Sequence, residues 1–216
     1  MATLDRVNPA QIERAALVAT FREKGPDAPT LCDGWTTRDL AAHLVVRERR
    51  PDASPGIMIP ALAGHTEKVQ NAAAQRPWDD LLADIASGPP IYSPFKLIDR
   101  WANLAEYFVH HEDVLRGGAD PDAPWTPRKP SPEVEEALIS SLKMVGPMNL
   151  KHSPATTTLQ TTDGQTLVTA GKGEPVTVAG TPGELVMFAF GRTPLDVTFT
   201  GSDDAIAALT AAKRGF

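Results

Sequence analysis

A glutamate and a histidine four residues apart carry the clearest chemical signal in this sequence. Glu106 and His110 fall within one predicted helix, where four residues rise about 6 Å and turn slightly more than once. Both side chains therefore leave the same face of the helix, and a carboxylate and an imidazole placed in this way can chelate one divalent ion. A hydrogen-bonded or solvated pair without any ion is the alternative at this spacing, and the spacing alone leaves both open.

His43 is the second candidate ligand. It lies on the apolar side of another predicted helix, so its ring should point inward. A core histidine whose ring is satisfied by a carbonyl or carboxylate group is the alternative interpretation. However, His43 lies on one predicted helix, and Glu106 and His110 lie on another. Two helices of one bundle would therefore each present metal-capable groups on an otherwise apolar face. Three protein ligands would leave a fourth position for water.

Three further residues lie close to these candidates. Asp113, three residues after His110, can accept the imidazole N–H of that histidine, or can instead form a salt bridge to Arg116. His111 is rotated by about a third of a turn from its neighbour and is not expected to share its surroundings. Cys32 precedes the helix of His43, where its thiol can either approach a metal or fill a small buried space.

The other histidines and the cysteine count narrow the choice of site. His65 and His152 lie in polar stretches and are expected to be solvated. Because Cys32 is the only cysteine, the sequence excludes an internal disulfide and a zinc site built on several cysteines. The sequence also contains no phosphate-binding glycine loop, no dinucleotide fingerprint and no nucleophile elbow.

Capping residues and prolines predict the helices that must position these groups. Asn8 and Pro9 begin the first helix, which ends near Gly25, and Thr36 with Asp39 begins the second, which carries His43. Further helices are predicted over about 61–75, in a short stretch after residue 78, over about 94–116, and from Ser131 to about Met144, with a loop over 51–60. The 20 prolines lie mostly between these segments, as expected for a four-helix bundle with crossover connections.

The composition changes near residue 150, after which threonine and valine predominate. Strands are predicted over 155–160, 165–169, 174–178 and 195–200, with a hairpin turn at Asp163-Gly164. Helices are predicted over 182–190 and 202–212. We therefore expect a mainly α protein with two domains, a four-helix bundle over 1–150 and a small α+β domain over 151–216.

Charge and hydropathy exclude several classes of protein. The 216 residues include 21 Lys and Arg against 27 Asp and Glu, and the formal net charge of −6 does not favour nucleic-acid binding. No stretch approaches the 18 apolar residues or more that a membrane span needs, and the N-terminus lacks the pattern of a signal peptide. We expect a soluble, cytoplasmic protein.

Three segments carry a resemblance to a known family. The run LCDGWTTRDLAAHL over 31–44 resembles the N-terminal signature of the mycothiol-dependent maleylpyruvate isomerase family, within the DinB-like metal-binding four-helix bundles. The segment EYFVHHEDV over 106–114 resembles the carboxylate-x-x-x-histidine segment of that family. The tail, with GELVMFAFGR over 183–192, is similar to the small C-terminal domain of those enzymes.

The resemblance implies a divalent metal, zinc in the first place, held by His43, Glu106 and His110. It also implies a small external thiol such as mycothiol as co-substrate, which the metal activates toward an electrophilic substrate. Arg192 matches in position an arginine that lies near the active site of the isomerase. Its alternative is a surface arginine after the helix-ending Gly191.

The middle of the chain, over 50–60 and 91–95, departs from the isomerase and looks like a related actinobacterial branch described as metal-binding. The metal site is therefore implied more firmly than the reaction.

The leading hypothesis is a zinc- and mycothiol-dependent transferase or isomerase. The alternatives are a non-catalytic metal-binding protein, such as a stress-related sensor or carrier, and a structural metal beside a ligand-binding C-terminal domain. A fourth protein ligand would favour the structural metal, whereas an open position would favour the enzyme.

Overall fold

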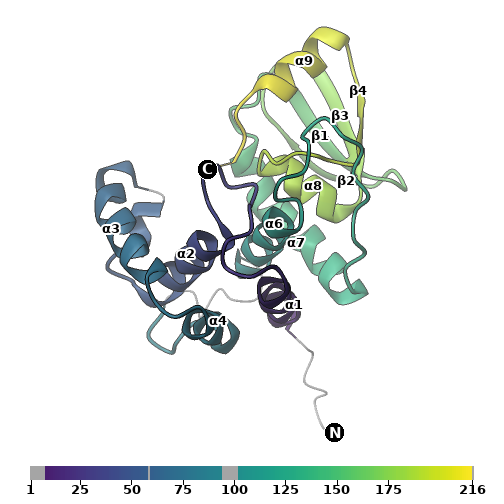
Figure 1. The fold of residues 1–216 in the computed structure, drawn as a ribbon. Coiled ribbons are helices and arrows are strands. Elements are labelled where there is room, and N and C mark those ends of the chain that lie inside the picture. Colours follow the sequence, from purple (N-terminus) through teal and green to yellow (C-terminus); the bar gives the residue numbers. More distant parts are fainter. Residues whose placement is uncertain (1–7, 58, 94–101, 216) are drawn as a thin grey trace, which may run out of the picture. The chain divides into compact units, whose positions relative to one another are not determined.

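The computed structural model of this protein describes residues 8–57, 59–93 and 102–215 (Figure 1). The chain divides into two compact units, Met1–Gly118 and Ala119–Phe216, which are described separately. This division lies earlier than the predicted change near residue 150, because the helix over 132–149 contacts elements of the C-terminal unit. The assignment of functional domains to 1–150 and 151–216 stays a prediction.

The N-terminal unit is helical. Its α-helices are α1 (Pro9–Lys24), α2 (Thr37–Arg49), α3 (Ala63–Ala74), α4 (Trp78–Ser87) and α6 (Ala102–Leu115), with short 3-10 turns at Ser54–Ile57 and Pro60–Leu62. Helix α1 packs against α6 and α4, and α2 packs against α3 and α4. The described helices agree with the predicted ones within a few residues. The predicted helix over 94–116 is described from Ala102 onward, and its first part lies outside the described residues.

The predicted capping residues begin α1 and α2. The side chain of Asn8 accepts a hydrogen bond from the Ala10 N–H at 3.1 Å, and Pro9 occupies the first turn of α1. At α2, Asp39 Oδ2 accepts hydrogen bonds from the N–H of Thr36 at 2.9 Å and from its hydroxyl at 2.7 Å. These contacts fix the first residue of α2, and thereby the direction in which His43 leaves the helix.

A hydrophobic core joins the helices of the N-terminal unit. Its largest members are fully buried side chains from α1, α2, α4 and α6: Leu17, Phe21, Leu40, Leu44, Leu81, Leu82, Ile85 and Tyr107. Burial of each such side chain contributes about 1.5–3 kcal/mol to the free energy of folding. The faces of α2 and α6 that carry polar groups are therefore held in place by the apolar faces beside them.

The C-terminal unit combines three helices with a four-stranded sheet. It contains α7 (Pro132–Asn149), β1 (Thr156–Thr161), β2 (Thr166–Ala170), β3 (Pro175–Gly180), α8 (Pro182–Ala189), β4 (Val197–Thr200) and α9 (Asp203–Ala211). The strand order is β2-β1-β3-β4, with β1 antiparallel to β2 and parallel to β3, and with β4 antiparallel to β3. Every residue of α8 is buried, and this helix contacts α7 and strands β1 and β3. The predicted mainly α fold with a small α+β C-terminal part is confirmed.

One helix extends beyond its predicted end. Helix α7 was expected to stop near Met144 but continues to Asn149, with Pro147 inside its last turn. A Cβ atom at Gly146 would lie 3.1 Å from Val168 Cγ2, so the glycine lets the end of the helix pack directly on β2. This packing holds the last turn in helical form although Pro147 cannot donate a backbone hydrogen bond.

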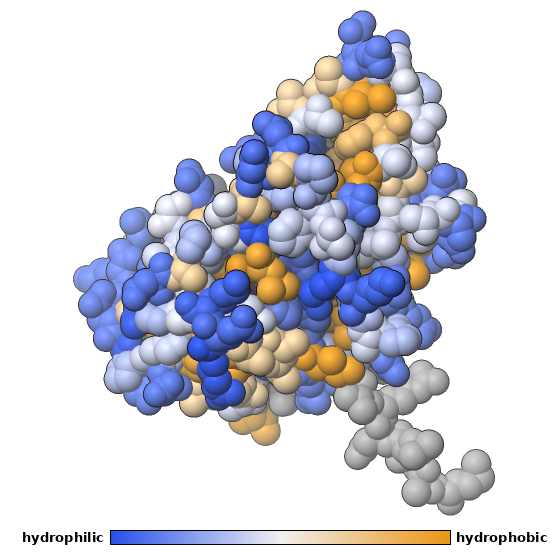
Figure 2. Space-filling model, turned by 45° about the vertical axis from the view of Figure 1, so that its right-hand side comes forward, coloured by the Kyte–Doolittle hydropathy of each residue, from blue (hydrophilic) through white to orange (hydrophobic). Residues whose placement is uncertain are grey.

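Among the residues that the structure describes, none of the helices is long and apolar enough to cross a bilayer. On the face shown in Figure 2, hydrophilic side chains predominate and the hydrophobic ones lie in separate groups.

Candidate metal centre

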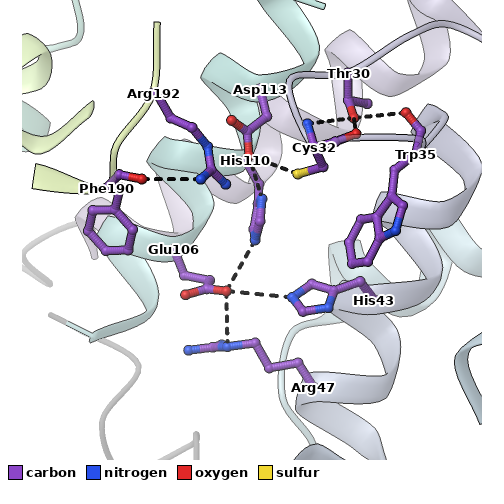
Figure 3. A network of polar contacts seen from close by, with 10 residues as sticks. All are labelled: Thr30, Cys32, Trp35, His43, Arg47, Glu106, His110, Asp113, Phe190 and Arg192. Carbon is purple, nitrogen blue, oxygen red and sulfur yellow. Dashed lines mark hydrogen bonds and ion pairs between the residues drawn. The ribbon is translucent and has the colours of Figure 1, made fainter. Parts of the chain in front are cut away.

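Three donor groups converge between α2 and α6 in the N-terminal unit. Glu106 Oε1 lies 3.1 Å from His110 Nε2 and 3.7 Å from His43 Nε2 (Figure 3). The rings of the two histidines meet edge to face, with centroids 5.3 Å apart. The donor atoms of all three residues lie within 4.8 Å of one another. Because metal–ligand bonds to nitrogen and oxygen are about 2 Å long, atoms this close fit around a single ion after small adjustments.

The three candidate donors are largely shielded from water. The side chains of His43 and His110 are each 9% exposed, whereas that of Glu106 is 23% exposed. The centre therefore has a protected interior and a partly open side at the carboxylate. Within the described residues, the donor group around His43 has three members, so a tetrahedral ion held by them would have one position left for a small molecule.

The ring of His43 is positioned from the loop that precedes α2. The ring of Trp35 packs on it with centroids 5.2 Å apart. The loop is fixed by Thr30, whose hydroxyl donates to the Trp35 carbonyl at 2.9 Å and accepts from the Cys32 N–H at 3.2 Å. The turn before α2 therefore holds the indole ring of Trp35 against the candidate ligand His43.

The ring of His110 is oriented by a contact at its second ring nitrogen, Nδ1. Asp113 Oδ2 lies 2.9 Å from His110 Nδ1 and also accepts a hydrogen bond from the Cys32 thiol at 3.2 Å. The Leu31 N–H donates to the Asp113 carbonyl at 2.9 Å, which ties the loop to α6. When His110 is neutral, a carboxylate at Nδ1 places the proton there and directs the lone pair of Nε2 toward Glu106. The predicted contact between Asp113 and His110 is present.

Cys32, His110 and Asp113 form a second group of metal-capable donors, on the opposite side of the same imidazole. The thiol and the ring nitrogen both use the Asp113 carboxylate as an acceptor in the structure. This arrangement suits a hydrogen-bonded support for His110. The half-buried Cys32 also packs against the hydrophobic core, as the alternative expectation for it required.

Arg47 is a charged neighbour that the sequence analysis missed. Its Nε lies 3.5 Å from Glu106 Oε1, and its Nη1 donates to Asn103 Oδ1 at 2.7 Å. Arg47 follows His43 by four residues, the same helical spacing that relates Glu106 to His110. That spacing was the signal that could have found it.

Burial and the neighbouring charged groups shift the pKa values of Glu106, His43 and His110. Burial alone would raise the pKa of Glu106, but the Arg47 charge and the hydrogen bond from His110 hold it well below its usual value. Burial lowers the pKa of His43. Burial would also lower the pKa of His110, but its contacts with Asp113, Cys32 and Glu106 raise it well above the usual range. These shifts favour an ionised Glu106 beside a charged His110, so that binding of a cation by His110 would release a proton.

The remaining histidines lie apart from these donors. His111 Nδ1 lies 2.7 Å from Glu13 Oε1, and its Nε2 lies 2.8 Å from the Thr20 hydroxyl, so its ring faces α1. His65 is exposed and lies 3.2 Å from Asp52 Oδ2, and His152 is exposed in the C-terminal unit. Arg116, which was the alternative partner expected for Asp113, forms an ion pair with Glu112, with 2.7 Å between Arg116 Nη2 and Glu112 Oε2. The separation of His111 from its neighbour follows from the rotation between adjacent helical residues.

Arg192 belongs to the C-terminal unit, and its guanidinium donates to the Phe190 carbonyl at 3.2 Å (Figure 3). Its backbone N–H donates to the Met187 carbonyl at 3.0 Å, next to the end of α8. A catalytic role for Arg192 stays a prediction from the resemblance, as do the metal-binding roles of His43, Glu106 and His110.

The fold and this cluster define a class of protein: a helical bundle with histidine and carboxylate donors between two helices, joined to a small α+β unit. The comparisons show what this chain is similar to. Residues 8–93 match the family model described as Mycothiol maleylpyruvate isomerase N-terminal domain. The resemblance recognised in the sequence is confirmed by this match, which covers the turn and the helix of His43.

The fold is also that of a solved enzyme. The crystal structure of a mycothiol-dependent maleylpyruvate isomerase is similar with a TM-score of 0.54 at 15% sequence identity, over 93% of each chain. A histidine-to-alanine mutant of the mycothiol-dependent maleylpyruvate isomerase gives a TM-score of 0.51 at 16% identity, again over 93% of each chain. No curated protein sequence matches this chain. At these identities the likeness concerns the fold.

Proposed function

We propose that this protein is a metal-dependent enzyme that uses a small external thiol of the mycothiol type. It would either isomerise an electrophilic small molecule with the help of the thiol or transfer the thiol onto that molecule. His43, Glu106 and His110 would hold a divalent ion, zinc in the first place. The observation that carries the proposal is the convergence of these three side chains on one partly open, otherwise buried point. The family match over 8–93 supports it, since the solved enzyme of similar fold is described as mycothiol-dependent.

Two imidazoles and one carboxylate form a donor set that suits zinc and leave a bound ion with a net positive charge. Such an ion, when bound, would lower the pKa of a thiol below its free value of about 8.5 and so favour the thiolate, the nucleophilic form, near neutral pH.

The residues of this chain would prepare the centre for that chemistry. Asp113 holds the Nδ1 proton of His110 and keeps Nε2 turned toward Glu106. Trp35 covers one side of His43 and limits the access of water to that ring. The chain's own thiol is engaged with Asp113 through a hydrogen bond. The reactive thiol would therefore come from outside the protein.

Metal analysis of the purified full-length protein tests the proposal. Wild type is expected to retain about one equivalent of divalent metal after dialysis, and His43→Ala and His110→Ala are expected to lose it. His65→Ala is the matched control, because His65 is exposed and pairs with Asp52 away from the three donors. Equal metal content in all four proteins would refute the assignment of the ligands.

A thiol titration tests the second half of the proposal. A small thiol at millimolar concentration should raise the unfolding temperature of the metal-loaded protein, because a ligand that binds only the folded state stabilises it. The same thiol should leave metal-free His110→Ala unchanged. The absence of any shift for the loaded wild type would count against a thiol-dependent enzyme and would favour a metal-binding protein without thiol chemistry.

A further inference from the structure

The second group of donors, on the side of the His110 ring that faces away from Glu106, has a geometry of its own. Asp113 Oδ2 lies 2.9 Å from His110 Nδ1 and 3.2 Å from Cys32 Sγ (Figure 3). The donor atoms of Cys32, His110 and Asp113 all lie within 4.8 Å of one another. A thiol, an imidazole and a carboxylate, the side-chain groups that bind zinc-like ions, therefore face one point.

The separations of these atoms fit a tetrahedral ion. With bonds of about 2.0 Å to nitrogen and oxygen and about 2.3 Å to sulfur, the donor atoms around such an ion lie about 3.3–3.5 Å apart. The observed separations of 2.9 Å and 3.2 Å need to increase by only about 0.3–0.4 Å. Cys32 is half-buried and lies in the loop before α2, whereas its two partners lie on α6. A small movement of the cysteine side chain therefore opens space for an ion.

The imidazole of His110 has a carboxylate at each of its nitrogens. A histidine that binds a metal through one nitrogen usually donates the N–H of the other nitrogen to a carboxylate or carbonyl group. For an ion on Nδ1, the acceptor would be Glu106, whose Oε1 lies 3.1 Å from Nε2. For an ion on Nε2, it would be Asp113. Either ring nitrogen can therefore bind an ion while the other donates.

The thiol decides which cations the second group prefers. Thiolate is a soft ligand and selects thiophilic cations, whereas the group around His43 offers nitrogen and oxygen only. On binding, the thiol proton would pass to water and the ring would keep one proton, at Nε2. Because Asp113 is fully buried and the thiol must lose its proton, we expect binding from free ion in solution rather than an ion that is retained after dialysis.

We propose that Cys32, Asp113 and Nδ1 of His110 form a second metal site, which takes a thiophilic cation such as Cd²⁺. An ion at this site makes Nε2 a donor to Glu106, so His110 no longer contributes a lone pair to the centre with His43. The two sites are therefore alternatives, and filling one disfavours the other. The second site does not depend on the function proposed above, because it uses neither His43 nor an external thiol.

Cadmium titrations of the full-length, reduced protein test the site. Because Cys32 is the only cysteine, a sulfur-to-cadmium charge-transfer band in the ultraviolet reports binding at this thiol. Metal-free wild type should give the band, and Asp113→Asn and His110→Ala should need at least about 10-fold more Cd²⁺ for half-saturation. No band in wild type, or the same half-saturation in all three proteins, as for a lone thiol that binds cadmium by itself, would overturn the site.

Two further variants and one spectrum complete the design. His43→Ala removes a ligand of the other centre alone, so it should give the band at the same or a lower Cd²⁺ concentration. His65→Ala, at an exposed histidine, is the matched control and should behave as wild type. If the variants at 110 and 113 do not fold, NMR of wild type labelled with heavy nitrogen in its histidines decides. At saturation of the band the ring proton of His110 should be on Nε2, and a proton that stays on Nδ1 would overturn the site.

Zinc and cadmium used together separate this proposal from the proposed function. Dialysed, zinc-loaded wild type should need about 5- to 100-fold more Cd²⁺ for half-saturation than metal-free wild type, because one imidazole serves both sites. Equal half-saturation with and without retained zinc would overturn the exclusion of one site by the other. Retained zinc without any cadmium band would overturn the second site alone, whereas a cadmium band without retained zinc would overturn the proposed function alone.

Discussion

At the scale of single residues, the central feature is an imidazole held from both sides. His110 faces Glu106 with Nε2 at 3.1 Å and Asp113 with Nδ1 at 2.9 Å. The two carboxylates have different surroundings, since Asp113 is fully buried and Glu106 is partly exposed. The partly exposed carboxylate is therefore suited to bind an ion and the buried one to orient the ring.

Replacing the buried carboxylate should weaken metal binding without abolishing it. We expect Asp113→Asn to lower the zinc affinity about 10- to 100-fold, because the amide no longer holds the Nδ1 proton as strongly. Competition with a chromogenic chelator measures this change. Asp52→Asn is the control, since Asp52 is half-exposed and pairs with Arg50 and His65. An unchanged affinity of Asp113→Asn would show that Asp113 does not support the centre.

At the scale of elements, the centre depends on how the loop before α2 meets the end of α6. A Cβ atom added at Gly117, just after α6, would overlap the carbonyl of Pro29 in that loop. The close approach of the two backbones therefore requires glycine. The same loop carries Cys32 and Trp35, which contact Asp113 and His43.

We expect Gly117→Ala to lower the free energy of unfolding by about 1–3 kcal/mol, because the loop must move to admit the methyl group. It should also weaken zinc binding. Gly64→Ala is the matched control, since a Cβ atom there meets nothing within 4 Å, and it should change stability by less than about 1 kcal/mol. Denaturant titrations measure both changes. Equal stability of the two variants would contradict the proposed packing of loop and helix.

The parts of the fold that depend on local signals could be predicted. Thr36 and Asp39 fixed the start of α2, and the four-residue spacing of Glu106 and His110 placed both on one face of α6. Long-range pairing left no such signal. The parallel alignment of β1 and β3, with Leu159 opposite Val178, follows from the packing of a whole sheet. The continuation of α7 through Pro147 likewise depends on its contact with Val168 in a distant strand.

The candidate site shows the same contrast. The spacing of residues and the resemblance brought His43, Glu106 and His110 together as candidates, and the structure places their donor atoms within 4.8 Å. Arg47 was missed because an arginine was not considered beside a cation. The link from Cys32 to Asp113 joins residues 81 positions apart, a pairing that spacing along the chain does not reveal.

At the scale of the whole molecule, the three proposed ligands belong to one of two compact units, Met1–Gly118. Metal binding should therefore stabilise that unit above all. At a zinc concentration 100 times the dissociation constant, linkage adds about 2.7 kcal/mol to the stability of a folded unit that binds one ion. We expect hydrogen exchange to slow in α2 and α6 and to change little in β1 and β3. A change confined to the strands would contradict the location of the centre.

The central claim, a metal centre open to an external thiol, is tested most directly by absorption spectroscopy of the cobalt-substituted protein. Adding a small thiol to wild type loaded with Co²⁺ should produce a sulfur-to-cobalt charge-transfer band, because the thiolate would bind at the open position. His110→Ala treated in the same way should give no such band above that of free Co²⁺ with thiol. A loaded wild type whose spectrum does not respond to thiol, or an equal band in His110→Ala, would contradict the account.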